Sequence, residues 1–186
     1  MLNPVKFCAC AASPTQFELD LTLIRAHNLT AMIQAPVLIE TKGTNIASQA
    51  FCTQSSLSIH SFTEDEANNV VKNPERSGDY RHHTDYEPNP WLLLDFGSPV
   101  RYDEILVFNR LHQPQRARTL VVDISIDGQG WHRIHTCDPE APPFGGTDGN
   151  PLRIVTPGYE TRYIRFQLQE PEFLHFVAVE VYRYDD

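Results

Sequence analysis

The chain has little positive charge. Its 186 residues include 15 Lys and Arg against 24 Asp and Glu, a formal net charge of -9. Affinity for nucleic acid depends mostly on Lys and Arg neutralising phosphates. The composition therefore excludes a general nucleic-acid binder, and the arginines have to be interpreted from their local surroundings.

Long apolar runs are also missing. No stretch approaches the roughly 20 apolar residues that a membrane-crossing helix needs, so we expect no transmembrane segment. The first residues give no export signal, because Pro4 and Lys6 interrupt a short apolar centre. The sequence leaves the cellular compartment open.

The few cysteines do not fit a metal-binding pattern. Cys8, Cys10, Cys52 and Cys137 lack the paired Cys-x-x-Cys spacing of structural zinc sites. Cys52 and Cys137 form either a disulfide or two buried thiols, and both possibilities stay open.

The signatures of common catalytic sites are absent as well. The chain has no nucleophile elbow and no phosphate-cradling glycine loop. His82, His83 and Asp85 could hold a metal, and a carboxylate pair for glycoside hydrolysis could be drawn from acidic residues in turns. Neither pattern is specific, so the sequence predicts a protein that is not an enzyme and has no cofactor. The candidate carboxylates are Glu64, Asp65, Glu66, Asp85 and Glu87.

The chain is long enough for one well-buried domain with a short appendage. We assign residues 44–186 to the domain and residues 1–43 to an N-terminal extension that packs on it. From residue 47 onward, apolar residues alternate with polar ones in short runs, which is typical of half-buried strands. Leu120, Val122 and Ile124 share one face of such a run, and residues 127–130 supply a hairpin turn before the strand that Trp131 opens.

Further strands are predicted at residues 91–96, 104–108, 162–168 and 175–184. The irregular residues 138–151 are predicted to be a long connection that crosses between sheets. Many short strands and no convincing interior helix predict an all-β, antiparallel jelly-roll sandwich whose end loops carry the function.

One region gathers side chains suited to binding a polar, uncharged ligand. His83 stands just ahead of the strand that begins with Pro90 and Trp91, and three arginines follow in the next turn. The planar fork of arginine donates two parallel hydrogen bonds to neighbouring hydroxyls, and histidine donates or accepts. The candidate binding residues are His83, Arg110, Arg116 and Arg118.

The order and spacing of several segments resemble the discoidin-like, coagulation factor 5/8 type C group of galactose-binding-like domains, and within it the fucolectin-like carbohydrate binders. The likeness covers roughly residues 44–184 and implies an antiparallel jelly roll whose loops at one end bind a sugar. The matching segments are residues 46–50, 55–56, 67–71, 83–84, 89–91, 95–97, 109–110, 122–131, 163–165 and 179–182.

The fucolectin-like motif is present in altered form. In that family a His is followed by twenty-four residues, an Arg, an Asp two positions on, and a second basic residue five further. Here residues 84–109 separate His83 from Arg110, His112 takes the place of the Asp, and Arg116 and Arg118 lie on either side of the second basic position. The resemblance implies a carbohydrate site and leaves the sugar open.

Many relatives hold calcium near these loops, using an Asp after an Asn-Ala-Val-like segment and a Glu before the last strand. In this chain Lys72 and Ala178 take those positions. Calcium needs six to eight oxygen ligands, including carboxylates. We therefore expect the calcium site to be lost, with the Lys72 ammonium bracing the loop in its place.

The leading hypothesis is a non-catalytic carbohydrate-binding module whose partner is a glycan or polysaccharide. Weak binding at one shallow site would make an oligomer useful for avidity. The alternative is a protein-interaction or adaptor domain on the same fold. Membrane insertion is not expected, because it needs exposed apolar loop tips and the loops are polar or acidic.

Several side chains have simpler interpretations that stay open. Arg110 could form an ion pair with Asp85 or Glu87, and in an extended loop Arg116 and Arg118 would face the same side. The tryptophans Trp91 and Trp131 are expected in the core, and His82 in solvent. If an aromatic ring stacks on the ligand, the candidates are Tyr80, Tyr86 and Phe62.

Overall fold

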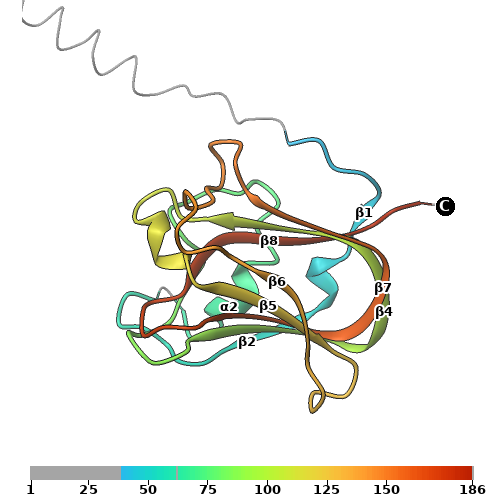
Figure 1. The fold of residues 1–186 in the computed structure, drawn as a ribbon, viewed down its shortest axis with the longest axis horizontal. Helices are drawn as coiled ribbons and strands as arrows, with labels where there is room; N and C mark the ends of the chain where they lie inside the picture. The colour runs from blue at the N-terminus through green and yellow to red at the C-terminus, as the bar shows by residue number, and fades with distance from the viewer. Residues whose placement is uncertain (1–38, 62, 186) are drawn as a thin grey trace, which may run out of the picture. The chain divides into compact units, whose positions relative to one another are not determined.

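Antiparallel strands form almost all of the regular structure (Figure 1). The structure, a computed structural model, describes residues 39–61 and 63–185. Short helices η1 (Ala47–Gln49), α2 (Glu66–Asn69) and η2 (Pro114–Ala117) lie in the connections. In chain order the described strands are β1 (Thr44–Asn45), β2 (Phe51–Gln54), β3 (His82–His83), β4 (Trp91–Asn109), β5 (Leu120–Ser125), β6 (His132–Thr136), β7 (Leu152–Leu168) and β8 (His175–Arg183).

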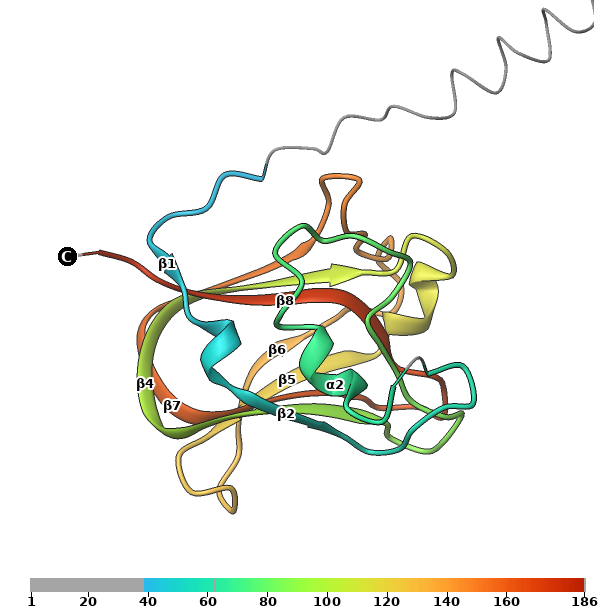
Figure 2. The same cartoon turned by 180° about the vertical axis from the view of Figure 1, so that it is seen from behind.

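Two long strands, β4 and β7, take part in both layers of a sandwich. In one layer the first half of β4 pairs with β2 and with the second half of β7, and β5 and β6 follow. In the other layer the second half of β4 pairs with β8 and with the first half of β7, and β8 pairs with β1 and β3. Both long strands curve round one end of the sandwich (Figures 1 and 2). The predicted all-β jelly-roll sandwich is confirmed.

The bend in β4 corrects one prediction. Residues 91–96 and 104–108 are two halves of one strand, whereas the sequence predicts two strands. The pairing with β7 shifts after Asp95 and again after Tyr102, and Gly97 takes a left-handed φ of 75°. Such irregularities bend a strand without ending it. For a similar reason β7 begins at Leu152 and not at residue 162, passing through Gly158 with a φ of 71°.

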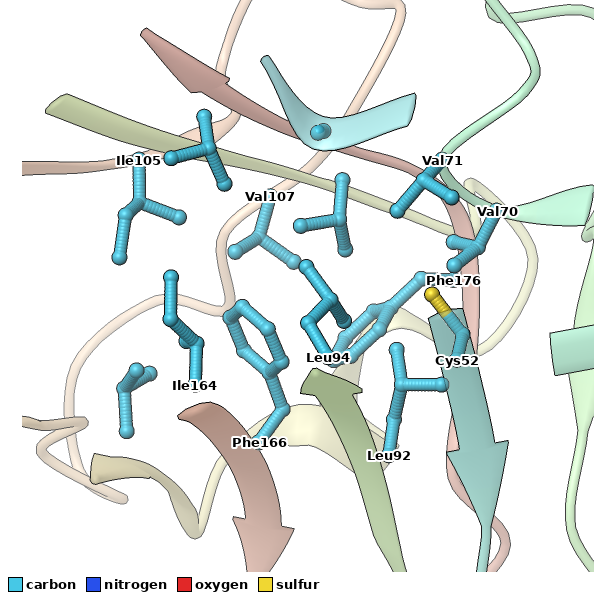
Figure 3. Packing of buried hydrophobic residues seen from close by; sticks show 14 of the residues in the cluster. Cys52, Val70, Val71, Leu92, Leu94, Ile105, Val107, Ile164, Phe166 and Phe176 are labelled. Carbon is cyan, nitrogen blue, oxygen red and sulfur yellow. The ribbon is translucent and has the colours of Figure 1, made fainter. Parts of the chain in front are cut away.

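Strand alternation explains the core between the two layers. Leu92 and Leu94 of β4 point inward toward Ile164 and Phe166 of β7, and all four side chains are fully buried (Figure 3). From the other layer, Ile105, Val107 and Phe176 meet them (Figure 3). Burying each such side chain contributes about 1.5–3 kcal/mol, so this cluster is the main source of stability.

Other expectations have mixed outcomes. Cys52 and Cys137 are free thiols, Cys52 fully buried and Cys137 partly. Trp91 and Trp131 are half-buried and do not belong to the buried cluster, so the expectation that they are core residues is wrong. Trp91 precedes the inward-facing Leu92 and therefore lies on the opposite face of its strand.

The remaining expectations concern segments rather than single side chains. The connection of residues 138–151 is irregular and leads from β6 in one layer to the first half of β7 in the other, as predicted. Residues 1–38 of the predicted extension lie outside the described residues, so that assignment stays a prediction. None of the described helices is long and apolar enough to span a membrane.

The strand directions place several connections at one end of the sandwich, opposite the bends of β4 and β7. These connections are residues 55–81, 84–90, 110–119, 137–151 and 169–174. In Figure 2 the yellow helix η2 and the teal and green loops share this end.

Candidate functional site

His83 is the centre of a cluster of polar and aromatic side chains at this end. Strand β3 pairs with the start of β8, which places His83 opposite His175. The side chain is almost fully buried, and its Nδ1 lies 2.7 Å from the carbonyl oxygen of Thr84. A carbonyl can only accept, so Nδ1 carries the hydrogen.

The ring of His83 is held in its neutral form. Burial lowers its pKa, and the charges of Arg110 and Arg116 lower it further, although the hydrogen bond to Thr84 opposes them. With Nδ1–H donating to Thr84, a neutral ring leaves Nε2 as a hydrogen-bond acceptor.

Arg110 is held between a carboxylate and an aromatic ring. Its Nη2 donates to Oδ2 of Asp79 at 2.5 Å, and its guanidinium carbon lies 5.0 Å from the ring centroid of Tyr80. The Tyr80 ring meets the His83 ring edge to face, with centroids 5.0 Å apart. Arg110 does form an ion pair, as the simpler interpretation expected, but with Asp79 and not with Asp85 or Glu87.

Arg116 is held in the same way on another side of His83. Its Nε lies 3.4 Å from Oε1 of Glu172, and its guanidinium carbon lies 4.7 Å from the ring centroid of Phe173. The Phe173 ring also meets the His83 ring edge to face, at 5.3 Å. Two acid–aromatic dipeptides, Asp79-Tyr80 and Glu172-Phe173, therefore hold one arginine each beside the same histidine.

Arg118 does not join this group. Its side chain is 56% exposed, and its Nη2 donates to Oε2 of Glu170 at 3.0 Å. It lines a separate pocket of about 180 Å³ with His135, Cys137 and Phe144. Residues of a 3₁₀ helix are about 120° apart around its axis, so residues two apart point in different directions. Because residues 114–117 form helix η2 rather than an extended loop, the expectation that Arg116 and Arg118 face one side is wrong.

His112 and Asp79 together alter the family motif. His112 stands where fucolectin-like proteins have an acid, and its Nδ1 lies 3.0 Å from Oδ1 of Asp79. Burial raises the pKa of Asp79, but hydrogen bonds and charge from Arg110 and His112 outweigh it, so the net shift is downward. The carboxylate beside the first arginine thus comes from a different loop.

Two more histidines lie close to the cluster. His175 is buried 5.4 Å from the ring of His83, and burial above all, with the nearby charges of Arg110 and Arg116, lowers its pKa to about 3. His82 is fully buried against Phe176, with ring centroids 5.3 Å apart, so the expectation that it lies in solvent is wrong. Burial lowers its pKa as well.

Two side chains tie the loop that carries Asp79 and Tyr80 to β8. Asn73 is buried, and its Nδ2 donates to the carbonyl oxygens of Ser77 and Val177, both at 3.0 Å. Arg76 forms two hydrogen bonds with the carboxylate of Glu180, at 2.9 and 3.0 Å. Lys72 is exposed, and its predicted role in bracing the loop stays a prediction beside these two ties.

The rim of the cluster contains exposed apolar side chains. Ile59 is 91% exposed and Tyr86 62%, and Leu111 is about half exposed. Tyr86 stacks edge to face on Phe173 at 5.5 Å. The expectation that these loops expose only polar or acidic groups is therefore wrong. Of the other proposed stacking rings, Tyr80 has Arg110 over its face, and Phe62 lies outside the described residues.

Three of the four sequence candidates, His83, Arg110 and Arg116, lie together in the structure, and several of their partners are not among the candidates. Asp79, Glu172 and Phe173 had no visible signal, because each lies far along the chain from the side chain it contacts. The acid–aromatic dipeptide does not single them out either, because Asp85-Tyr86 and Asp95-Phe96 have the same pattern. Among residues 39–61 and 63–185, no group of three or more His, Cys, Asp or Glu side chains is arranged to hold a metal ion.

Comparison with known proteins gives one family match. The family model of the F5/8 type C domain matches residues 52–177. No curated protein sequence matches the chain.

Solved structures share the fold at low sequence identity. A fucose binding module from Streptococcus pneumoniae is 23% identical with a TM-score of 0.63, over 76% of this chain and 99% of that one. The f-lectin (fucolectin) from striped bass (Morone saxatilis) serum is 21% identical with a TM-score of 0.63, over 77% of this chain and 48% of that one. The Clostridium perfringens module CpGH89CBM32-5, in complex with GalNAc-beta-1,3-galactose, is 14% identical with a TM-score of 0.57, over 75% and 99%.

Proposed function

The chain belongs to the F5/8 type C domain family, and we propose that it is a non-catalytic glycan-binding module whose site is formed by His83, Arg110 and Arg116. The observation that carries the proposal is the placement of two arginines beside one neutral histidine. Arg110 and Arg116 supply donors, and Nε2 of His83 supplies an acceptor. Neighbouring hydroxyls on a sugar ring both accept and donate, so they match this set.

The solved structures support the same ligand class. Their names refer to fucose binding, to a fucolectin and to a complex with GalNAc-beta-1,3-galactose. These ligands are all saccharides but are not the same sugar, so they favour a glycan without selecting one. His112 in place of the motif's acid keeps the choice of sugar open.

The state of the carboxylates supports binding rather than catalysis. Glycoside hydrolysis needs one carboxyl group with a raised pKa to act as an acid. In this cluster Asp79 accepts from Arg110 and His112 and its pKa is lowered. Glu172 lies beside Arg116. Carboxylates paired in this way hold arginines in place.

We also propose that binding needs no calcium. The loop of residues 72–78 is tied to β8 by the Asn73 amide and by the guanidinium of Arg76 on Glu180. These groups supply the links that a cation makes in relatives with an intact calcium site. Lys72, placed where those relatives have a carboxylate, adds a charge that disfavours a metal ion.

An adaptor function is the second candidate, favoured by the exposed Ile59, Tyr86 and Leu111 at the rim. Exposed apolar groups beside a polar pocket are common in protein interaction sites. A rim of this kind serves a glycan-binding module as well, because Tyr86 presents an open ring on which a sugar can stack.

A glycan array with matched variants separates the two candidates. Arg110→Ala should abolish binding, because it removes donors from the cluster, whereas Arg118→Ala should leave binding within about twofold, because Arg118 pairs with Glu170 elsewhere. Equal losses in the two variants would contradict the proposed site. No glycan binding by the wild type would favour the adaptor.

A further inference from the structure

Each arginine of the cluster has its own carboxylate. Arg110 pairs with Asp79 and Arg116 with Glu172, while His83 is held neutral. The two positive and two negative charges cancel. The two arginine side chains are largely buried, with exposed fractions of 19% and 21%, whereas their carboxylates Asp79 and Glu172 are 37% and 31% exposed and face the solvent side of each pair.

The pairing leaves hydrogen-bond donors available. A guanidinium has five N–H groups. The carboxylate contact uses Nη2 of Arg110 and Nε of Arg116. The Nε of Arg110 is buried without a partner, so the donors left for hydroxyl oxygens are the other N–H groups of the two guanidiniums, and using them breaks neither pair. An anionic group would instead have to displace a carboxylate or lie next to one, and both cost free energy because like charges repel.

Resting on the proposed function, we propose that Asp79 and Glu172 are the specificity-determining residues that make this site select neutral saccharides over anionic ones. Neither residue needs to contact the sugar. Each cancels the charge of one arginine and fixes its guanidinium against Tyr80 or Phe173. The site therefore recognises hydroxyl geometry, and uronic, sialylated, sulfated or phosphorylated sugars are disfavoured.

The other charged and titratable groups around the cluster do not give it a net positive charge. His112 contacts Asp79 from the solvent side. Glu87 accepts hydrogen bonds from Ser55 and Ser56, and the exposed Asp85 adds further negative charge. His60 faces His83 with ring centroids 5.8 Å apart. Removing one or both of the paired carboxylates should change the charge of the pocket directly.

The test compares the wild type with Asp79→Asn, Glu172→Gln and the double variant. Inorganic sulfate is the probe, titrated at constant ionic strength and followed by NMR of the arginine Nε–H groups. Wild type should show no saturable shift of the Arg110 and Arg116 signals. The double variant should show saturable shifts, with a Kd for sulfate at least tenfold below the lowest value that the wild-type titration allows. Glu170→Gln is the matched control, because it frees Arg118 outside the cluster, and it should leave the Arg110 and Arg116 signals as in the wild type.

Saturable sulfate binding to the cluster in the wild type, as tight as in the double variant, would overturn the inference. So would a folded double variant that gains no anion binding. If the double variant does not fold, the wild-type titration and the single variants still decide, because an anion must be excluded from the unmodified site.

A parallel glycan array keeps this result distinct from the proposed function. Wild type should bind neutral glycans at least tenfold better than their sialylated or sulfated counterparts, and raising NaCl should change this binding little. A preference for the anionic glycans would refute the inference while supporting glycan binding. Binding to no glycan would refute the proposed function, while the sulfate titration would still report on the role of the two carboxylates.

Discussion

His83 can accept a hydrogen bond from a hydroxyl only while its ring is neutral. Its surroundings ensure this at neutral pH, because burial and the charges of Arg110 and Arg116 lower its pKa. The Nδ1–H bond to Thr84 also fixes which nitrogen accepts. The single most important property of the site is thus set by contacts around one side chain.

The buried histidines predict how stability depends on pH. For His82, His83 and His175 the folded-state pKa is lowered, to about 3 for His175. Their contribution is fully present above the unfolded pKa near 6.5 and is lost as the pH falls toward the folded pKa. Each histidine that must lose a proton to fold contributes about 1.4 kcal/mol per pH unit in this range.

This dependence can be measured by urea unfolding at pH values from 7.5 to 4.5. Wild type should lose stability steadily below pH 6.5. His175→Leu should reduce the slope of the free energy of unfolding against pH by about 1.4 kcal/mol per pH unit, which corresponds to one proton. This holds whatever the absolute stability of the variant. The exposed His132 gives the matched control His132→Leu, which should keep the wild-type slope of unfolding free energy against pH. A wild-type stability that is flat over this range would show that the histidines are not held neutral.

Among the elements, the loop of residues 72–78 matters most, because it carries Asp79 and Tyr80 to the site. Asn73 ties the loop to Val177 and Ser77. Lys72 beside it is exposed, although the sequence suggested that its ammonium braces the loop. A buried amide that satisfies two carbonyls is costly to remove, since the carbonyls lose their donors.

Asn73→Ala and Lys72→Ala test this brace as neighbouring variants. The first should destabilise the protein by about 1–3 kcal/mol, and the second by less than about 0.5 kcal/mol, in urea unfolding. A chelator should leave the melting temperature of the wild type unchanged. If the chelator lowers that temperature and added calcium restores it, a metal brace replaces the one we propose.

The strands show what alternation of apolar residues can predict. It located β5 and β8 to within a residue or two, because each is a mostly apolar run that stays in one layer. It failed for β4 and β7, whose bends at Gly97 and Gly158 interrupt the pattern although the pairing continues. A local pattern cannot reveal that two runs belong to one strand spanning two layers.

The grouping of the candidate side chains was predictable to a similar degree, whereas their role in binding stays a proposal. His83, Arg110 and Arg116 follow from the resemblance to a family motif, which preserves their order. Asp79 and Glu172 depend on how the loops are placed by strand pairing, such as the bridge between Glu87 and Glu172. The motif places Arg116 and Arg118 on either side of its second basic position, and the turn of η2 is what directs the two side chains apart.

For the molecule as a whole, the net charge of -9 agrees with a neutral site. An acidic protein repels anionic ligands at long range, and its own cluster gives them no unpaired cation. A site with a few hydrogen bonds at the surface binds weakly once the cost of immobilising the ligand is included, with a Kd on the order of millimolar to micromolar. Several copies on one assembly or surface would raise the apparent affinity.

The proposed binding of a glycan at His83, Arg110 and Arg116 can be tested by a crystal structure of the protein soaked with a mixture of monosaccharides. We expect a neutral sugar with hydroxyl oxygens about 2.7–3.2 Å from Nε2 of His83 and from both guanidinium groups. A sugar held in the pocket of Arg118 and Cys137, with the three residues of the cluster unoccupied, would contradict it.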